Sequence, residues 1–529
     1  MEQTVRAIAE AIAAGAPDGW THAELHARAG RGGSSTTGGY LPRAAGFHRG
    51  VTAPHQQLMQ LAQALGRDRG WEPVSMEFRC LPSGEYRFTA FHDAVTRVSG
   101  GMNGFQAVLD AGARLPQPGL DQPASTAAPA GDPGLAAARF RAYLERRAAI
   151  LGHPEELPPP ATAADIAEAE ARLGCRLPAD LRALYEIADG DGDGYEHRYL
   201  FEGCAWLPLE SLAAQDEDED DDEPGLRPWH GWDLEWDAVV FDATPGETVR
   251  RCGGHPGWLR FATPEDGNYL AVDTVPARDG RPGQVIWTGR DHDEGPGYVA
   301  DSLTSLLGHY LDLLDQGAYE VRGDVISLRE PARQHAPQLY IGGGVPEEVA
   351  PSLQAVHINN VPGSVDLAPL TAARGLRRLH LNRAVTADLA PVRGLPVESL
   401  RAGLTGGDLT PLAGHPHLAS LDLATTGPAD LTPLRTAPRL RGLDLSAADI
   451  ADVSVLTGLA GLRYLALNRR QWSALLDGTA AGTGTGAPPA LAAARLTDTD
   501  ATLDEALAWA ARLGLDAAGP FRTGGSLRA

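Results

Sequence analysis

Leu418-Ala-Ser-Leu-Asp-Leu423 is one copy of a short leucine pattern that recurs along the C-terminal part of the chain. Six copies fit the form L-x-x-L-x-L, some with Val, Ile or Ala in place of Leu, and they are Leu353–Ile358, Leu376–Leu381, Val397–Ala402, Leu418–Leu423, Leu440–Leu445 and Leu462–Leu467. Their first residues are separated by 23, 21, 21, 22 and 22 residues. One short alternating run per period of this length predicts stacked units that each contribute one strand.

A second element of the repeat is Asp-Leu-x-Pro, which follows the first four copies at Asp366, Asp388, Asp408 and Asp430. Together the two elements identify residues 338–475 as leucine-rich repeats, so we expect a C-terminal solenoid. The Asn that usually follows the strand is missing, which predicts a less rigid stack. The residues between the leucines should face the concave side and contact a protein; they are His357, His380, Arg401, Asp422 and Asp444. Residues 476–529 hold a Gly/Thr tract and a helix near 501–513 that could cap the stack.

Charge is concentrated in the middle of the 529-residue chain, whose length predicts three or four domains. Residues 135–322 hold 16 Arg against 38 acidic residues, a net charge of −22 out of −24 for the whole chain. This acidity argues against binding to nucleic acid, which relies on basic residues, and against binding to anionic membranes. It is compatible with a basic protein as partner.

Residues 135–322 carry an ordered set of motifs, which are Ile166-x-x-x-Glu170-x-x-Leu173-Gly174, Leu177-Pro178-x-x-Leu181-x-x-Leu184-Tyr185, Pro256-Gly-Trp-Leu, Gly267-Asn-Tyr-Leu-Ala-Val-Asp273, Gly283-Gln-Val-Ile and Asp301-Ser-Leu. In this order they resemble the SUKH superfamily of the Smi/Knr type. The resemblance implies a small, non-catalytic α+β domain. Many bacterial members are immunity proteins that neutralise a toxin, often a nuclease, whereas fungal relatives act as regulatory scaffolds.

The N-terminal residues 1–113 have the pattern of a small α+β domain, with helices near 2–14 and 55–66 and strands near 74–80 and 85–91. A Gly-rich turn is expected at 30–39. Asp18-Gly-Trp-Thr, Trp71-Glu-Pro and Gly84-Glu-Tyr-Arg-Phe resemble the YezG-like family of bacterial immunity proteins, although Trp20 and Trp71 could equally be core residues. Residues 114–134 contain five prolines without apolar periodicity, which predicts a linker.

The sequence contains no complete catalytic, cofactor or metal constellation, so we expect none of these sites. Asp189-Gly-Asp-Gly-Asp-Gly194 begins like a calcium loop, but its twelfth position is Leu200 where Glu is required. The four cysteines include no CxxC pair. Asp291, His292, Asp293 and Glu294 could suit a metal, but no second His lies at ligand spacing, and a solvated contact loop fits better.

Eight consecutive acidic residues interrupt the acidic domain, and they are Asp216, Glu217, Asp218, Glu219, Asp220, Asp221, Asp222 and Glu223. Two interpretations are open: a solvated loop without a role, or an electrostatic lure that speeds association with a basic protein. Three tryptophans follow this run, and they are Trp229, Trp232 and Trp236. If exposed, they would be interface anchors; if buried, they would be core residues.

The sequence thus predicts a multidomain protein with an α+β N-terminal domain, an α+β SUKH-like domain and a C-terminal leucine-rich-repeat solenoid. We expect a non-enzymatic, immunity or antitoxin-like protein that binds a basic toxin, and an intracellular regulatory scaffold is the alternative. Glu2 and Glu10 interrupt the first apolar stretch, and no run of about 18 apolar residues occurs, so a cytoplasmic protein is expected.

Overall fold

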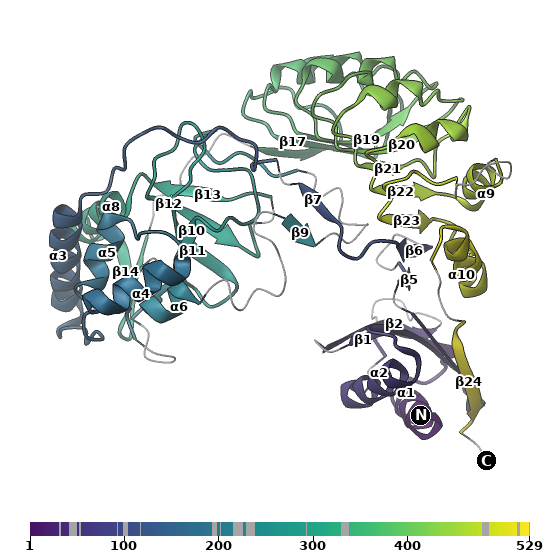
Figure 1. Ribbon diagram of the computed structural model, residues 1–529, viewed down its shortest axis with the longest axis horizontal. Coiled ribbons are helices and arrows are strands. Elements are labelled where there is room, and N and C mark those ends of the chain that lie inside the picture. Colours follow the sequence, from purple (N-terminus) through teal and green to yellow (C-terminus); the bar gives the residue numbers. More distant parts are fainter. Residues whose placement is uncertain are drawn as a thin grey trace. The chain divides into compact units, whose positions relative to one another are not determined.

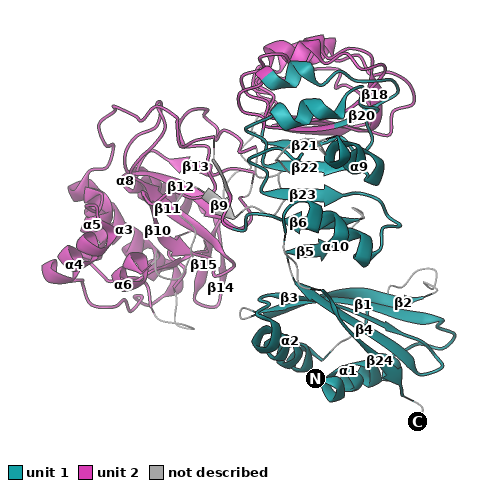
Figure 2. Ribbon diagram, turned by 45° about the vertical axis from the view of Figure 1, so that its right-hand side comes forward, with its two compact units in different colours: residues 1–111, 423–435, 441–529 teal, residues 112–422, 436–440 magenta. Residues whose placement is uncertain are grey.

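The chain folds into two compact units, each built from segments that are distant in sequence (Figure 2). The computed structural model describes residues 1–30, 33–41, 50–51, 54–92, 94–98, 104–116, 118–192, 198–201, 203–214, 226–228, 239–292, 294–329, 338–478, 486–515 and 519–527. Unit 1 comprises residues 1–111, 423–435 and 441–529, and unit 2 comprises residues 112–422 and 436–440. The compact units therefore divide the chain differently from the consecutive domains expected from sequence.

In unit 2, the acidic segment 135–322 forms an antiparallel sheet in the order β13-β12-β11-β10-β8, with helices on one face (Figure 1). The strands are β8 (Ala205–Trp206), β10 (Trp258–Thr263), β11 (Asn268–Asp273), β12 (Gln284–Gly289) and β13 (Gly297–Ala300). The helices are α3 (Pro133–Leu151), α4 (Ala163–Leu173), α5 (Ala179–Tyr185), α6 (Leu209–Ala213) and α8 (Leu303–Asp315). Thr162 and Asp165 form a capping box at the start of α4, as its sequence suggests.

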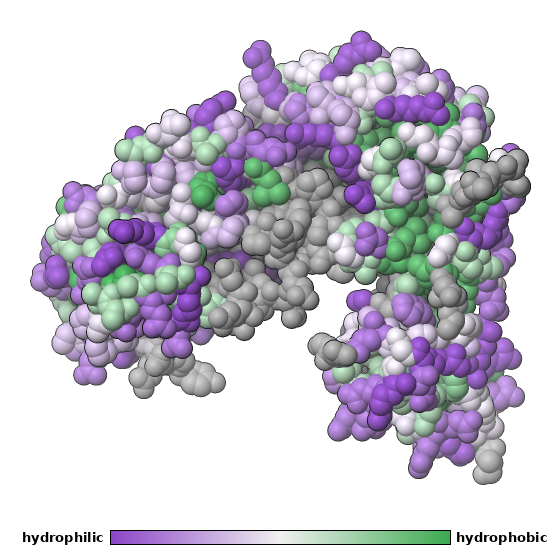
Figure 3. Space-filling model, in the orientation of Figure 1, coloured by the Kyte–Doolittle hydropathy of each residue, from purple (hydrophilic) through white to green (hydrophobic). Residues whose placement is uncertain are grey.

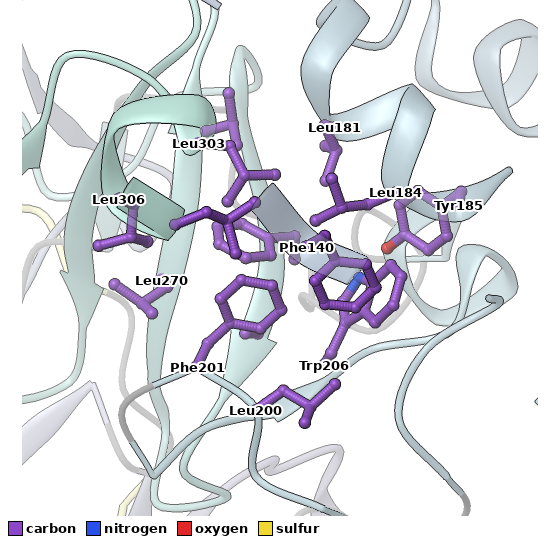
Figure 4. Packing of buried hydrophobic residues seen from close by; sticks show 14 of the residues in the cluster. Phe140, Leu181, Leu184, Tyr185, Leu200, Phe201, Trp206, Leu270, Leu303 and Leu306 are labelled. Atoms are coloured by element: carbon purple, nitrogen blue, oxygen red, sulfur yellow. The ribbon is translucent and has the colours of Figure 1, made fainter. Parts of the chain in front are cut away.

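Alternation along the strands sends side chains to two different layers. Leu270 and Val272 pack against the helices, in a core with Phe140, Tyr185, Phe201 and Trp206 (Figure 4). Ala271 and Ile286 point to the opposite face, where they join Ala243, Val249 and Cys252 in a second cluster. The segment around 239–252 therefore forms a loop layer over the face of the sheet that the helices leave open.

The segment 114–134 is not the free linker that its composition predicts. Arg250 donates from Nη1 to the carbonyl oxygens of Gly119 (3.1 Å) and Gln122 (2.8 Å). Ser125 Oγ donates to the Gly280 carbonyl oxygen at 2.6 Å. Five prolines prevent regular structure here, but they do not prevent an extended segment from being fastened to a folded surface by its carbonyl groups.

The first repeats, also in unit 2, contribute parallel strands in chain order: β16 (Leu339–Gly342), β17 (Ala355–Asn359), β18 (Arg378–Thr386) and β19 (Ser399–Leu404). The next strand, β20 (Ser420–Thr425), begins in unit 2 and ends in unit 1. Short 3-10 turns alternate with them, at Ala368–Ala372, Ala390–Gly394 and Thr410–Leu412. The strands β17 to β20 coincide with the leucine pattern, and leucines such as Leu379, Leu400 and Leu421 are buried. Figure 1 shows the turns along one side of the stack and the strands along the other.

The repeated aspartates explain where the 3-10 turns begin. A carboxylate oxygen accepts a hydrogen bond from the backbone N–H two residues later in five cases, which are Asp366 to Ala368, Asp388 to Ala390, Asp408 to Thr410, Asp430 to Thr432 and Asp452 to Ser454, at 2.7–2.9 Å. The side-chain hydroxyl of the residue two positions later, followed by its backbone N–H, lowers the pKa of Asp408, Asp430 and Asp452 by hydrogen bonding to the carboxylate. The Asp of the repeat is therefore a structural cap.

Unit 1 contains the N-terminal sheet, in the order β2-β1-β3-β4-β24. Its elements are α1 (Glu2–Ala14), β1 (His22–Gly30), β2 (Gly33–Leu41), α2 (His55–Arg69), β3 (Val74–Cys80), β4 (Glu85–His92) and β24 (Phe521–Ser526). Trp71 is buried in this core, and Trp20 packs on Tyr40. The expected Gly-rich turn is wrong, because residues 33–41 form a strand in which a Cβ on Gly38 would lie 2.1 Å from the Glu24 carbonyl oxygen.

The two ends of the chain exchange strands within unit 1, which the sequence did not reveal. The C-terminal β24 pairs with β4 at the edge of the N-terminal sheet. Conversely, β6 (Phe105–Val108) and β5 (Val95–Arg97) extend the sheet of the last repeat strands, where β6 pairs with β23 (Ala493–Leu496). The expected helix is present as α10 (Leu503–Arg512), but β6 rather than this helix covers the outer edge of β23.

The remaining elements of unit 1 belong to the last repeats, and they are β21 (Gly442–Asp444), β22 (Tyr464–Leu467) and α9 (Arg469–Asp477), with a 3-10 turn at Val453–Gly458. In unit 2, β14 (Tyr319–Arg322) pairs with β15 (Val325–Leu328), and β7 (Arg114–Pro116) pairs with β9 (Leu226–Pro228). Among the helices that the structure describes, none is both long and apolar enough to span a lipid bilayer.

Deleting residues 516–529 should loosen the N-terminal sheet. The deletion removes all backbone pairing along β4's outer edge and the contact of Phe521 with Phe88. We expect a loss of about 1–3 kcal/mol of local stability, measured as faster amide exchange in Glu85–His92. Phe521→Ala, which keeps the strand, should have a smaller effect. Unchanged protection of β4 in the deletion variant would contradict the pairing.

Candidate protein-binding surface

The loop layer of the acidic domain is joined to the first repeats by backbone-directed hydrogen bonds. Asp242 N–H donates to Gln354 Oε1 at 2.8 Å, and Gln354 Nε2 returns a hydrogen bond to the Asp242 carbonyl oxygen at 2.9 Å. Val239 and Phe241 bury their side chains against Ala355 of β17. The side-chain amide of Gln354 thus forms two hydrogen bonds with the backbone of Asp242, and this clamp joins the loop layer to the first repeats. Both the loop layer and β17 belong to unit 2.

Beside this clamp lies a network of two arginines and two carboxylates, the junction network, made of Asp242, Arg251, Arg377 and Glu398. Arg251 Nη2 contacts Glu398 Oε2 at 2.5 Å, and the two side chains are only 8% and 3% exposed. Arg377 pairs with Asp242 and, at 3.3 Å, with Glu398. Equal numbers of opposite charges make the burial tolerable, but each member depends on the others because an uncompensated buried charge is costly.

A third contact involves Arg378, the first residue of β18. Its side chain is 1% exposed, and Nη1 donates to Glu294 Oε1 at 2.8 Å. Its guanidinium also lies 5.0 Å from the centre of the Phe241 ring. Glu294, predicted as a partner-binding residue, is therefore tied to the repeats through one oxygen while its side chain stays 45% exposed.

A pocket of about 550 Å³ opens next to these contacts. It is lined by Phe241, Asp242, Ala243, Thr244, Asp291, His292, Glu294, Gly295, Pro296, Gly297, Tyr298, Gln338 and Leu339. The charged groups of this lining, Asp242, Asp291 and Glu294, are all carboxylates. On the face shown in Figure 3, hydrophilic and hydrophobic residues are interspersed over this domain.

The concave row of the repeats begins at the same junction. The register aligns Ile341 with His357, His357 with His380, and His380 with Arg401. The two imidazole rings stack with their centres 4.9 Å apart. Arg401 Nε donates to Asp422 Oδ2 at 2.8 Å. Four of the five predicted concave residues therefore form one continuous polar row in unit 2.

The acidic side of this surface belongs to a domain with known relatives. Residues 160–309 match the model of the SMI1 / KNR4 family (SUKH-1). They form a SMI1/KNR4 domain. The resemblance seen in the ordered motifs is thereby confirmed. Two of those motifs meet in its core, where Gln284 Nε2 donates to Asp273 Oδ2 at 2.9 Å and links β11 to β12.

Three similar proteins come from fungi. A KNR4/SMI1 homolog of Yarrowia lipolytica is 29% identical over 220 residues, covering 32% of this chain and 29% of that protein. The cell wall biosynthesis/cell cycle regulator smi1 of Schizosaccharomyces pombe is 30% identical over 177 residues, covering 32% and 34%. The glucan synthesis regulatory protein of Neurospora crassa is 26% identical over 205 residues, covering 32% and 36%. The chain thus spans about a third of the length of these curated relatives.

Two solved structures are also similar in part, both internalins of Listeria monocytogenes. Internalin C2 is 29% identical, with a TM-score of 0.20, and the match covers 22% of this chain and 52% of that one. The internalin inlF is 23% identical, with a TM-score of 0.21, and the match covers 25% and 41%.

Two residues of the predicted contact loop of the SMI1/KNR4 domain contact neighbouring side chains. Asp291 Oδ2 accepts from Asn268 Nδ2 at 2.7 Å, and the His292 ring stacks on Trp287. Within the described residues, no group of three His, Cys, Asp or Glu side chains is arranged to hold a metal ion. Asp293, the acidic run from Asp216 to Glu223, and Trp229, Trp232 and Trp236 lie outside the described residues.

Asp444 differs from the other concave residues, because its Oδ1 accepts from the N–H (3.0 Å) and Oγ (2.6 Å) of Ser446. Sequence reasoning also missed the residues of the junction network. A signal was available, because Arg377, Arg378 and Glu398 place charges directly after the first apolar residue of adjacent repeats. Their partners, Asp242 and Arg251, lie in irregular structure that no periodicity marks.

The stacked histidines should make the first repeats sensitive to acid. Burial, then the positive Arg401, lower the pKa of His380 well below its ordinary value. Burial and Arg378 lower the pKa of His357, while Glu294 opposes this shift. The native state therefore disfavours protonation, whereas the unfolded chain takes up protons near pH 6.5.

Stability of the repeats should consequently fall as the pH drops below about 6.5, by at most about 1.4 kcal/mol per pH unit for each histidine. We expect faster amide exchange in β17 and β18 at pH 5 than at pH 7, after correction for the intrinsic exchange rate. His380→Gln should reduce this difference. An equal acid sensitivity in His380→Gln and wild type would contradict the role of His380.

Proposed function

We propose that the chain is a non-enzymatic protein-binding protein in which the SMI1/KNR4 domain and the first repeats present one surface to a basic partner. The observation that carries this proposal is the junction network, in which Arg251 and Arg377 share the buried carboxylate of Glu398. Because these charges need one another, the two modules should remain docked and act together. The carboxylate-lined pocket and the polar concave row then belong to a single surface.

Charge indicates the class of partner. The segment 135–322 has a net charge of −22, and the exposed carboxylates of Asp291 and Glu294 belong to residues that line the pocket. A field of this sign attracts and orients a basic protein and repels acidic ones.

In its finer form, the proposal is that the partner is a toxin, such as a nuclease, which the chain neutralises as an immunity protein. A nuclease has a basic substrate-binding surface, and an acidic surface could occlude it. The second candidate is a regulatory scaffold for a partner of the same cell, favoured by the names of the fungal relatives, which are regulators.

Affinity capture with the tagged full-length chain tests the proposal. We expect a basic protein to be retained by wild type and by Glu168→Arg, a control on the exposed face of α4 whose side chain is 73% exposed. Asp291→Arg, which makes the same charge change beside the pocket, should reduce retention about tenfold. Equal retention by all three proteins, or retention only of acidic proteins, would contradict the proposal.

Co-expression then separates the two candidate functions. A captured partner that arrests growth when it is expressed alone, but not when it is expressed together with the chain, supports the immunity role. A partner that is harmless alone supports the regulatory scaffold instead.

A further inference from the structure

The strand β16 forms an edge of the repeat sheet. It pairs with β17, and among the described residues no strand pairs with its other side. The carbonyl oxygen of Gln338 accepts hydrogen bonds from the N–H groups of Gln354 (2.7 Å) and Ala355 (2.9 Å). Since backbone groups alternate in direction along a strand, the N–H and C=O groups of Leu339 and Ile341 point away from β17.

The side chains of these two residues are unusually exposed. Leu339 is 40% and Ile341 is 62% exposed, whereas the corresponding Ala355 of β17 is fully buried. Natural proteins usually protect an open strand edge with charges, prolines or bulges. Here the edge instead combines outward backbone groups with exposed apolar side chains, a combination that favours the addition of another strand.

The two ends of this edge differ in chemistry. Leu339 and Gln338 line the pocket, together with the carboxylates of Asp242, Asp291 and Glu294. Ile341, farther along, lies beside His357 in the concave row. An added strand would therefore meet negative charge at one end of β16 and an apolar surface at the other.

We propose that the outer edge of β16 receives an extended segment of the basic partner as an additional strand. The segment forms backbone hydrogen bonds with Leu339 and Ile341, places an apolar side chain against Ile341 and inserts an Arg or Lys side chain into the pocket. This inference rests on the proposed function and specifies how that partner is recognised. Complementary charge selects a basic segment over a second copy of β16, whose sequence Leu-Tyr-Ile-Gly supplies no basic side chain.

Defined peptides test the inference with the full chain. The probe is a fluorescent peptide of about seven residues with Arg at both ends and Val in the middle, and its binding is measured by anisotropy at about 50 mM salt. The controls are the same peptide with Glu in place of Arg, and the Val/Arg peptide with N-methylated amides on one edge. We expect saturable binding of the first peptide and at least about tenfold weaker binding of both controls.

Variants of the chain separate the two parts of the site. Ile341→Pro removes an N–H that points away from β17, so it should spare the fold while weakening the peptide about tenfold. Ile341→Val, which keeps this N–H, should bind within about twofold of wild type. Asp291→Asn combined with Glu294→Gln should weaken binding at about 50 mM salt, with little difference near 1 M, where charges are screened.

If Ile341→Pro lowers the thermal stability, Ile341→Lys replaces it as the test variant. Ile341→Lys keeps all backbone groups, and its positive charge should weaken binding of the Arg peptide. Binding of the N-methylated peptide as strong as that of the unmodified one would overturn strand addition. So would an absence of binding, or a wild-type dimer that Ile341→Pro dissociates. Capture of a basic partner through Asp291 would survive each of these results, so failure of this inference is distinguishable from failure of the proposed function.

Discussion

Glu398→Ala should detach the SMI1/KNR4 domain from the repeats. The substitution removes the carboxylate that Arg251 and Arg377 share, and it leaves two arginines, 8% and 11% exposed, with one carboxylate, Asp242, between them. Loss of one member of a buried charge network costs about 3–5 kcal/mol. We expect faster amide exchange in residues 239–252 and in the first residues of β18.

The controls for Glu398→Ala distinguish the buried network from ordinary surface charge. Glu347→Ala removes an exposed acid of the same part of the chain and should leave exchange unchanged. Glu398→Gln keeps an oxygen acceptor and should have a smaller effect than Ala. Because a chain of several domains does not unfold in one step, the effect is measured locally. An unchanged exchange rate in both segments of Glu398→Ala would contradict the docking.

Leu421→Asp should disrupt the repeats themselves. Leu421 is fully buried in β20, and a carboxylate there has no partner to compensate the loss of water. The cost should exceed about 4 kcal/mol. Repeats depend on their neighbours, so protection should be lost in the flanking strands as well as in β20.

The neighbouring residue provides the control for this prediction. Asp422→Ala alters the concave row next to Leu421 and removes the ion pair of Asp422 (28% exposed) with Arg401 (35% exposed). A partly exposed pair contributes at most about 1 kcal/mol, so the strands should stay protected. Equal protection of Leu421→Asp and Asp422→Ala would contradict the assignment of Leu421 to the core.

Local and repeated signals made part of this architecture predictable. The leucine pattern placed the strands β17 to β20 because each copy encodes the same alternation of buried and exposed positions. The concave residues His357, His380, Arg401 and Asp422 followed from that alternation. The SMI1/KNR4 domain was recognisable because its motifs lie on consecutive strands and helices in a fixed order.

Contacts between distant segments were not predictable in this way. No sequence pattern in β24 predicts its pairing with β4, which lies more than 400 residues earlier in the chain. Likewise, Asp242 and Arg251 find Arg377 and Glu398 only after both segments have folded. The proline-rich segment 114–134 was predicted to be a free linker, because its composition rules out regular secondary structure. Composition does not show whether such a segment is bound to a folded surface. Here the bonds are accepted by backbone carbonyl groups, which every residue has.

We infer that one surface, formed by the SMI1/KNR4 domain and the first repeats, binds a basic protein. Hydrogen exchange of the full chain with and without the captured partner tests it most directly. We expect simultaneous protection of residues 294–298 around the pocket and of the strands β16 to β18. Protection restricted to one of these two segments, or confined to the N-terminal sheet of unit 1, would contradict it.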